Sequence, residues 1–270
     1  GVPKTIDNDL AVTDHTPGYG SAAKYIASTM KEIIRDALVQ PIKIVNIIEI
    51  MGRNAGWLTA AAALAKGDDC EGADLIYLPE TVFDINKFVA KVQEIQKTKK
   101  QIVVAVSEGV KTADGKYVCE SASSNMLVDS FGHKQLSGTA TALANVISNE
   151  IGCKTRAIEF STIQRCASHI ASLTDVNEAF IVGGIAVKAV FDGETGKVGI
   201  FQRLSNKPYL MGTSIYDVNA IANVEKTVPQ EWIINDGTGV SQEALDYMRP
   251  LIQGEIYPYM VDGLPRHIKL

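Results

Sequence analysis

The sequence has 270 residues, of which 46% are hydrophobic, enough to bury the core of one large or two modest domains. Its 26 basic and 31 acidic residues give a net charge of −5, so we do not expect nucleic acid as a partner. No run approaches the ~20 apolar residues of a membrane span, and we expect no membrane partner. The four cysteines are widely separated, which is typical of a reducing cytoplasm rather than of disulfides or a zinc site.

Buried strands and helices alternate along most of the chain. Apolar spacing predicts helices at 21–40, 55–66, 84–99, 139–151 and 175–190, the third of them capped by Asp84. Short runs rich in β-branched residues predict strands at 44–50, 75–78, 102–106 and 156–160. This alternation indicates an α/β fold with a parallel sheet. Turns are predicted at 111–117 and, between strand-like runs, at 192–196. After Gln202 we expect short strands, loops and a helix near 242–248.

The first nine residues, Gly1–Asp9, are already rich in charged and polar side chains. Functional loops seldom lie at a free terminus, because termini fray and such loops need a rigid scaffold. We therefore expect the sequence to be a fragment of a longer protein, with an N-terminal part missing.

The segment Lys4-Thr5-Ile6-Asp7-Asn8-Asp9 places two carboxylates at i and i+2, so both can face one side of an extended loop. Phosphoryl transfer uses such a set. One carboxylate accepts the proton of the attacking hydroxyl, another helps to hold Mg²⁺, and a cation offsets charge on the transferred group. A surface turn accounts for the same residues, and on spacing alone it is the better interpretation.

The segment Met51-Gly52-Arg53 lies between a predicted strand and a predicted helix, where open α/β sheets bind ligands. Gly52 permits a ligand to approach the backbone, helix-terminal N–H groups favour anions, and Arg53 supplies fixed positive charge. An ordinary strand–helix turn with a surface arginine explains the pattern equally well.

Two other segments carry candidate ligand-binding side chains. Glu80 follows a buried strand and Pro79, where it can accept sugar hydroxyls, although alone it reads better as a first-turn helix acid. Arg156 and Arg165 flank a strand and a loop, and arginine forks match phosphate oxygens, although surface ion pairs are slightly favoured in isolation.

The histidines and tryptophans show no metal-binding spacing, and we interpret them as structural, packing or surface residues. They are His15, His133, His169, His267, Trp57 and Trp232.

Taken together, these segments resemble the phosphofructokinase family. Gly1–Asp9 is similar to its catalytic loop, and Met51-Gly52-Arg53 followed by Ala55-Gly56-Trp57 is similar to its sugar-phosphate loop. Pro79-Glu80 and Gln164-Arg165 follow in the same order at similar distances. The resemblance covers nearly the whole chain and is weaker after about Gln202.

The resemblance implies a role for each matching position. Asp7 matches the general base that deprotonates the 1-hydroxyl of fructose 6-phosphate, and Asp9 matches a carboxylate associated with Mg²⁺. Lys4, Thr5 and Arg53 match groups around the transferred phosphoryl group. The implied substrate contacts are Thr5, Ile6, Asp7, Met51, Gly52, Arg53, Glu80, Arg156, Thr162 and Arg165.

Arg156 matches an arginine that is lent to the neighbouring subunit's 6-phosphate, which implies a homo-oligomer with shared active sites. The sequence departs from the family at two positions. Ile44 stands where many members lend a second arginine, and Thr162 stands where a histidine is common. We expect Lys134 or Arg266 to help to rebuild the 6-phosphate contacts.

The resemblance implies two lobes with mainly parallel sheets flanked by helices. Residues 1–18 would end the phosphoryl-donor lobe, 19–163 would form the sugar-phosphate lobe, 164–230 would return to the donor lobe, and 231–270 would form a C-terminal segment. The family's glycine-rich donor-binding segment is absent, so the isolated chain is expected to bind sugar phosphate poorly and to transfer nothing.

Lys4 bears on the phosphoryl donor. ATP-dependent members of the family typically carry glycine at this position, whereas pyrophosphate-dependent members carry lysine. A lysine near the bridging region can stabilise the charge on a leaving phosphate. We therefore expect phosphorylation of fructose 6-phosphate to fructose 1,6-bisphosphate by pyrophosphate in the cytoplasm, as a reversible step of glycolysis.

Three alternatives remain open: an ATP-dependent 6-phosphofructokinase, an inactive regulatory relative that binds a sugar phosphate, and a non-kinase sugar-phosphate-binding module. Asp7, Asp9 and Arg53 occur together, which disfavours the second, and the third has no need for paired aspartates.

Overall fold

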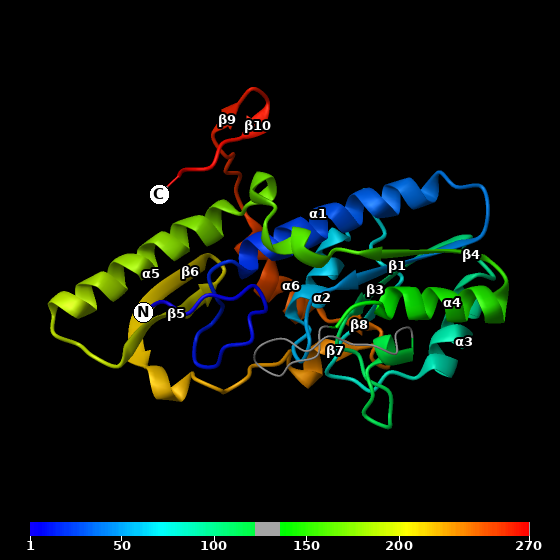
Figure 1. Ribbon diagram of the computed structural model, residues 1–270, viewed down its shortest axis with the longest axis horizontal. Helices are drawn as coiled ribbons and strands as arrows, with labels where there is room; N and C mark the ends of the chain where they lie inside the picture. Colours follow the sequence, from blue (N-terminus) through cyan, green and yellow to red (C-terminus); the bar gives the residue numbers. More distant parts are fainter. Residues whose placement is uncertain (122–135, 270) are drawn as a thin grey trace. The chain divides into compact units, whose positions relative to one another are not determined.

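The computed structural model describes residues 1–121 and 136–269 and divides them into two compact units (Figure 1). The first unit comprises residues 1–25, 162–226 and 246–270, and the second comprises residues 26–161 and 227–245. The division lies close to the predicted boundaries after residues 18 and 163. Beyond residue 226 it differs, because residues 227–245 group with the second unit and the last stretch groups with the first.

A four-stranded parallel sheet forms the centre of the second unit, in the order β2-β3-β1-β4. The strands are β1 (Ile44–Ile50), β2 (Leu75–Tyr77), β3 (Gln101–Ser107) and β4 (Lys154–Glu159). Every residue of β1 is buried, because this strand lies between two others. The predicted parallel α/β architecture is confirmed, and the predicted bounds of β1 are those observed.

Helices cover both faces of this sheet. Helices α3 (Ile85–Ile95) and α4 (Thr139–Ile151) bury apolar side chains, among them Phe88 and Leu143, in one core with strand residues such as Ile47. Figure 1 shows α1 (Tyr19–Leu38) on the other side of the sheet from α4. The predicted cap is present, since the Asp84 carboxylate accepts hydrogen bonds from the N–H groups of Asn86 and Lys87.

The first unit is built around an antiparallel hairpin. Strands β5 (Lys197–Asn206) and β6 (Tyr209–Asp217) pair along their length, and helix α5 (Leu173–Phe191) packs against both. Helix α6 (Gln242–Met248) has the predicted bounds, and its last three residues belong to this unit. The minor strands are β7 (Ile233–Ile234), β8 (Gly239–Val240), β9 (Met260–Val261) and β10 (Leu264–Pro265).

Two predicted elements differ from the structure. The continuous helix at 55–66 is a single α turn, α2 (Trp57–Ala60), followed by a 3-10 helix at Ala61–Ala65, and such tightening is common where a helix ends. The turn at 192–196 joins helix α5 to β5 rather than two strands. The turn at 111–117 is present, closed by an antiparallel bridge between Lys111 and Tyr117. Across 1–121 and 136–269, no helix combines the length and the apolar character needed to cross a membrane.

Candidate active site

The predicted catalytic loop and the residues that follow it, to residue 18, lie in the first unit, and half-buried and buried residues alternate along residues 5–9. Ile6 and Asn8 are buried, whereas Asp7 and Asp9 are half-buried, and Asn8 between them has φ +55° rather than the extended conformation that the sequence predicted. The loop folds back on itself, since Thr5 pairs with Gly18 in a parallel bridge. The Thr5 hydroxyl also accepts a hydrogen bond from the N–H of Asp7 at 3.1 Å.

The two carboxylates of this loop influence each other. Burial raises the pKa of Asp9, and the neighbouring charge of Asp7 raises it further. Two partly buried acids in one loop form an anionic donor set of the kind that Mg²⁺ accepts. This ion commonly binds one or two carboxylates and takes its other ligands from water and substrate phosphates. Within 1–121 and 136–269 no three His, Cys, Asp or Glu side chains gather to hold a metal, so a metal here would rely on such outside ligands.

A hollow of about 210 Å³ lies beside the catalytic loop within the first unit. Lys4 and Ile6 line it from the loop, and Gln164 and Arg165 line it from a 3-10 helix at Ser161–Arg165. Residues that are 160 positions apart in the sequence thus bring two cationic side chains to one concave surface. Asp175 lines the same hollow, where its carboxylate accepts hydrogen bonds from the N–H groups of Gly18 and Ser21.

The predicted sugar-phosphate loop lies in the second unit, where β1 ends. Gly52 has φ +142°, and a Cβ at this position would lie 2.6 Å from the carbonyl oxygen of Ala55. The backbone that follows β3 also lies close to this loop, because a Cβ on Gly109 would lie 1.9 Å from the carbonyl oxygen of Arg53. The chain therefore requires glycine at both positions in order to place Met51 and Arg53.

Glu108 adjoins the predicted sugar-phosphate loop and was not singled out by the sequence analysis. It follows β3, which is the direct neighbour of β1 in the sheet, so both strands end at the same edge. The Glu108 carboxylate accepts a long hydrogen bond of 3.4 Å from the N–H of Gly52, and the Ser107 hydroxyl donates to the Gly52 carbonyl. A signal was present in the sequence, since Glu108 follows a predicted buried strand just as Glu80 does.

Glu80 follows β2, one strand farther from β1 than Glu108 is. Its Oε1 accepts hydrogen bonds from the N–H groups of Gly56 at 2.8 Å and Val228 at 2.9 Å. Glu80 therefore ties the start of α2 to the returning chain at residues 227–245. Its role as an acceptor of sugar hydroxyls stays a prediction.

The residues considered for the 6-phosphate differ in burial and in the unit to which they belong. Arg156, on β4, forms an ion pair with Asp36 of α1 at 3.0 Å, and both side chains are partly exposed. Thr162 and Arg266 are exposed, whereas Ile44 is fully buried and can present nothing to a partner. Lys134, which we also considered for this phosphate, lies outside the described residues, as does His133.

Glu49, near the end of β1, is a buried acid whose charge is disfavoured. Burial raises the pKa of Glu49 to about 7, even though its carboxylate accepts a hydrogen bond of 2.8 Å from the N–H of Ala140. The residue that pairs with Glu49 on the adjacent strand β4 is Glu159, whose like charge also raises the pKa of Glu49. The first turn of α4 is thus fastened to the strand that carries the sugar-phosphate loop.

His15 is structural, as predicted, and it is held between two acids. One ring nitrogen lies 2.9 Å from the Asp14 carboxylate and the other 2.8 Å from that of Glu178, while the ring stacks on Phe201. Burial lowers the pKa of His15, but the hydrogen bonds and charges of the two acids outweigh this effect and raise it overall. His169 and His267 are exposed.

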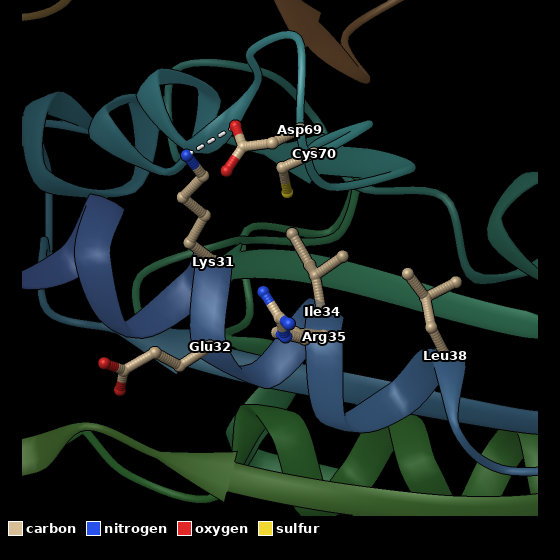
Figure 2. A pocket seen from close by; sticks show the side chains of 7 residues that line it. All are labelled: Lys31, Glu32, Ile34, Arg35, Leu38, Asp69 and Cys70. Carbon is tan, nitrogen blue, oxygen red and sulfur yellow. Dashed lines mark hydrogen bonds and ion pairs between the residues drawn. The ribbon is translucent and has the colours of Figure 1, made fainter.

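A separate hollow of about 350 Å³ lies in the second unit and is lined by none of the predicted site residues. Figure 2 shows Lys31 of α1 reaching the Asp69 carboxylate, with which it forms an ion pair of 2.7 Å. Ile34, Arg35 and Cys70 also line this hollow. Cys70 is a free thiol, as are Cys119, Cys153 and Cys166.

Comparison with known proteins places this arrangement in a family. The family model described as phosphofructokinase matches residues 1–172, which include the catalytic loop, the sugar-phosphate loop and Arg165. The chain belongs to the phosphofructokinase family.

Several relatives match this phosphofructokinase-family chain over its whole length. It is 40% identical to the pyrophosphate–fructose 6-phosphate 1-phosphotransferase of Halomonas elongata and 41% identical to that of Xanthomonas campestris pv. campestris. Each alignment covers 100% of this chain but only 64% and 65% of the relative, respectively. The chain thus spans less than two thirds of the length of these curated relatives.

A solved structure agrees with the fold. The pyrophosphate-dependent phosphofructokinase of Nitrosospira multiformis superposes with a TM-score of 0.86 at 38% identity, covering 99% of this chain and 63% of the other. The phosphofructokinase-like fold predicted from the sequence is therefore confirmed.

Proposed function

We propose that this chain carries the sugar-phosphate site and the catalytic loop of an enzyme that transfers a phosphoryl group from pyrophosphate to fructose 6-phosphate. The product is fructose 1,6-bisphosphate. The observation that carries the proposal is the loop at residues 4–9, with two half-buried carboxylates and with Lys4 and Arg165 lining the adjacent hollow. The names of the two relatives aligned along the whole chain support the same substrates.

In the proposed reaction, Asp7 accepts the proton of the sugar's 1-hydroxyl as its oxygen attacks the phosphoryl group. Thr5 and Lys4 lie beside the transferred group, and the cationic side chain of Arg53 offsets the negative charge that develops in the transition state. Asp9 would hold Mg²⁺, which neutralises phosphate charge when bound. The roles of these residues are assigned by their match to the family's motifs.

The sugar is held by the loop at Met51–Arg53 and by the carboxylates near it. We assign Glu108 as a further acceptor for sugar hydroxyls, because its carboxylate adjoins Gly52 of the predicted sugar-phosphate loop and accepts a hydrogen bond from the Gly52 N–H. Glu80 is the weaker candidate, since one of its oxygens already accepts from two backbone N–H groups. On this view a Glu108→Gln variant binds fructose 6-phosphate less tightly than a Glu80→Gln variant does.

Lys4 favours pyrophosphate over ATP as the donor. Pyrophosphate has no nucleoside that a protein can bind, so cationic side chains must neutralise the negative charge on the leaving phosphate. Lys4 is exposed and lines the hollow that Arg165 also lines. We also propose a homo-oligomer in which Arg156 of one subunit serves its neighbour's site, and a cytoplasmic location consistent with the four free thiols.

The test uses the complete protein encoded by the gene that contains this sequence. Formation of fructose 1,6-bisphosphate is measured with Mg²⁺ and either pyrophosphate or ATP, and again after chelation of the metal. Turnover with pyrophosphate alone, abolished by chelation, is the expected result. Turnover with ATP alone overturns the assignment of Lys4. Binding of fructose 6-phosphate without turnover from either donor overturns the proposed enzymatic activity and favours an inactive regulatory relative.

A further inference from the structure

Asn8 occupies an unusual position between the two carboxylates of the catalytic loop. It is fully buried, and its backbone has φ +55°, in the left-handed region that asparagine tolerates better than most residues. Its neighbours Asp7 and Asp9 leave the backbone on either side of this turn. Any rotation at Asn8 therefore changes the orientation of the two carboxylates relative to each other.

The side chain of Asn8 is held by Tyr247, a residue 239 positions later in α6. The Asn8 amide nitrogen donates to the Tyr247 hydroxyl at 3.0 Å, and this hydroxyl donates to the carbonyl oxygen of Asp14 at 2.6 Å. A single phenol thus joins the start of the catalytic loop to its middle. The amide oxygen of Asn8 is buried and has no hydrogen-bond partner among the described residues, so the bond to Tyr247 is the side chain's polar anchor there.

The ring of Tyr247 is itself held in place. The guanidinium of Arg203, from β5, lies 4.4 Å from the ring centroid and donates to the carbonyl oxygen of Tyr247 at 3.0 Å. Arg203 also pairs with the Asp14 carboxylate at 3.0 Å. Burial raises the pKa of Tyr247, so its hydroxyl keeps the proton that it donates. Tyr247 is therefore held at its ring and its carbonyl oxygen by Arg203, and its hydroxyl donates its proton to Asp14.

We propose that Tyr247 is a positioning residue of the phosphoryl-transfer site, which fixes the backbone at Asn8 and thereby aims Asp7 and Asp9. The inference rests on the proposed function, because it assigns these carboxylates to catalysis. It extends that function to a side chain that lies outside the part of the chain matched by the family model. A misdirection of about 1 Å in a reacting group can reduce turnover by about a hundredfold, so loss of this support should be felt in catalysis.

The variant Tyr247→Phe removes the hydroxyl and keeps the ring beneath Arg203. In the complete protein we expect kcat to fall about 10- to 100-fold while KM for fructose 6-phosphate changes less than about threefold. The matched control is Tyr209→Phe. The guanidinium of Arg203 also lies over the ring of Tyr209, 5.1 Å from the ring centroid. The Tyr209→Phe variant likewise loses one hydrogen bond, the 2.7 Å bond from the Tyr209 hydroxyl to Glu178. The hydrogen bond of Asn8, by contrast, is made to Tyr247. We expect Tyr209→Phe to lower stability and to leave kcat near that of the wild type.

A double-mutant cycle tests whether Tyr247 acts through Asn8. Glycine tolerates φ +55°, so Asn8→Gly keeps the backbone conformation available while removing the side chain that Tyr247 holds. In this background Tyr247→Phe should have little further effect on kcat, because the link is already broken. Full additivity of the two effects overturns the proposal, as does an equal loss of kcat in Tyr209→Phe or a change confined to KM.

Amide hydrogen exchange gives a second measurement that needs no turnover. Exchange over residues 5–10 should accelerate in Tyr247→Phe and stay unchanged in Tyr209→Phe. Unchanged exchange in both variants overturns the proposal, whatever the assays report. If the wild type transfers no phosphoryl group while exchange responds as expected, then the proposed function fails but the support of the loop by Tyr247 stands.

Discussion

Asp7 is the residue on which the proposed chemistry depends most directly. Replacing it with serine removes the base but leaves the backbone and the phosphate-binding cations in place. In the complete protein we expect Asp7→Ser to reduce turnover by about a thousandfold or more, with fructose 6-phosphate binding largely retained. Steady-state kinetics and equilibrium binding measure the two effects.

A suitable control for Asp7→Ser is Asp192→Ser, because Asp192 is an exposed acid paired with Lys188 far from the loop in sequence. It should leave both turnover and binding unchanged. A parallel loss of binding and turnover in Asp7→Ser would show that Asp7 binds the sugar and does not act as the general base.

His15 makes stability depend on pH at the scale of a single side chain. Its pKa is raised in the folded state by Asp14 and Glu178 despite burial, so the folded protein binds this proton more tightly than the unfolded chain. The stabilisation is complete below the unfolded pKa of about 6.5 and is lost as the pH rises through the higher folded value.

We therefore expect the urea midpoint of the wild type to fall as the pH is raised from about 6 upward, and the fall to be smaller in His15→Gln. Burial lowers the pKa of Lys226, another group near Asp14, to about 8, and this titration is common to the two proteins. Parallel curves for the two proteins would assign the pH dependence to other groups.

At the scale of elements, the carboxyl group of Glu49 links strand β1 to helix α4, and its pKa is raised to about 7. Because the pKa of Glu49 is about 7 in the folded state and lower in the unfolded chain, the folded state binds the extra proton between these values. Its contribution to stability falls as the pH rises from about 4.5 to 7, by an amount on the order of 3 kcal/mol.

Glu49→Gln keeps an oxygen that can accept from the N–H of Ala140 and removes the titration. We expect the variant to gain stability relative to the wild type as the pH rises from about 5 to 8, measured as unfolding free energy in urea. Glu94→Gln, an exposed change of the same kind on α3, should behave like the wild type. A constant difference between Glu49→Gln and the wild type would mean that Glu49 is ionised throughout.

The elements themselves were largely predictable, and the exceptions have local causes. Strand β1 and helix α4 were placed correctly because continuous β-branched runs and helical spacing are strong local signals. The hairpin β5–β6 was not resolved from the sequence, because its residues alternate only in part between buried and exposed. The short α2 differs because its residues are buried on all sides and show no amphipathic period.

The site was predictable only where one segment contains it. Residues 4–9 carry a pattern of their own, although on spacing alone a surface turn was the better interpretation, and Asp7 and Asp9 were singled out by their match to the family's motif. Glu108 could not be preferred to Glu80, because each follows a buried strand and only the order β2-β3-β1-β4 shows that β3 adjoins β1. Tyr247 leaves no signal near Asn8, since a contact across 239 positions is a property of the fold.

At the scale of the whole molecule, the proposed sharing of active sites can be tested by mixing two inactive proteins. Arg156→Ala removes the arginine that a subunit lends, and Asp7→Ser removes the base that it keeps. In a mixed dimer one of the two sites would regain both native residues. Equal mixtures that exchange subunits should therefore recover about a quarter of the wild-type activity.

Recovery requires subunit exchange, so the mixture is unfolded and refolded together, and each variant is refolded alone as its control. Arg156 lies partly exposed in an ion pair with Asp36, so the variant is expected to fold. No recovery in a mixture that forms mixed oligomers would mean that Arg156 serves its own subunit.

The discontinuity of the first unit bears on how the protein is made. Residues 1–25 emerge from the ribosome long before the stretches 162–226 and 246–270 that complete their unit, whereas most of the second unit is contiguous. The four-stranded sheet can assemble while Asp7 and Asp9 still have no fixed partners. Tyr247 follows in the stretch 246–270, so Asn8 would gain its hydrogen bond only after the stretches 26–161 and 162–226 have been made. A partly made chain would then hold a formed four-stranded sheet while the loop around Asn8 still lacks the hydrogen bond from Tyr247.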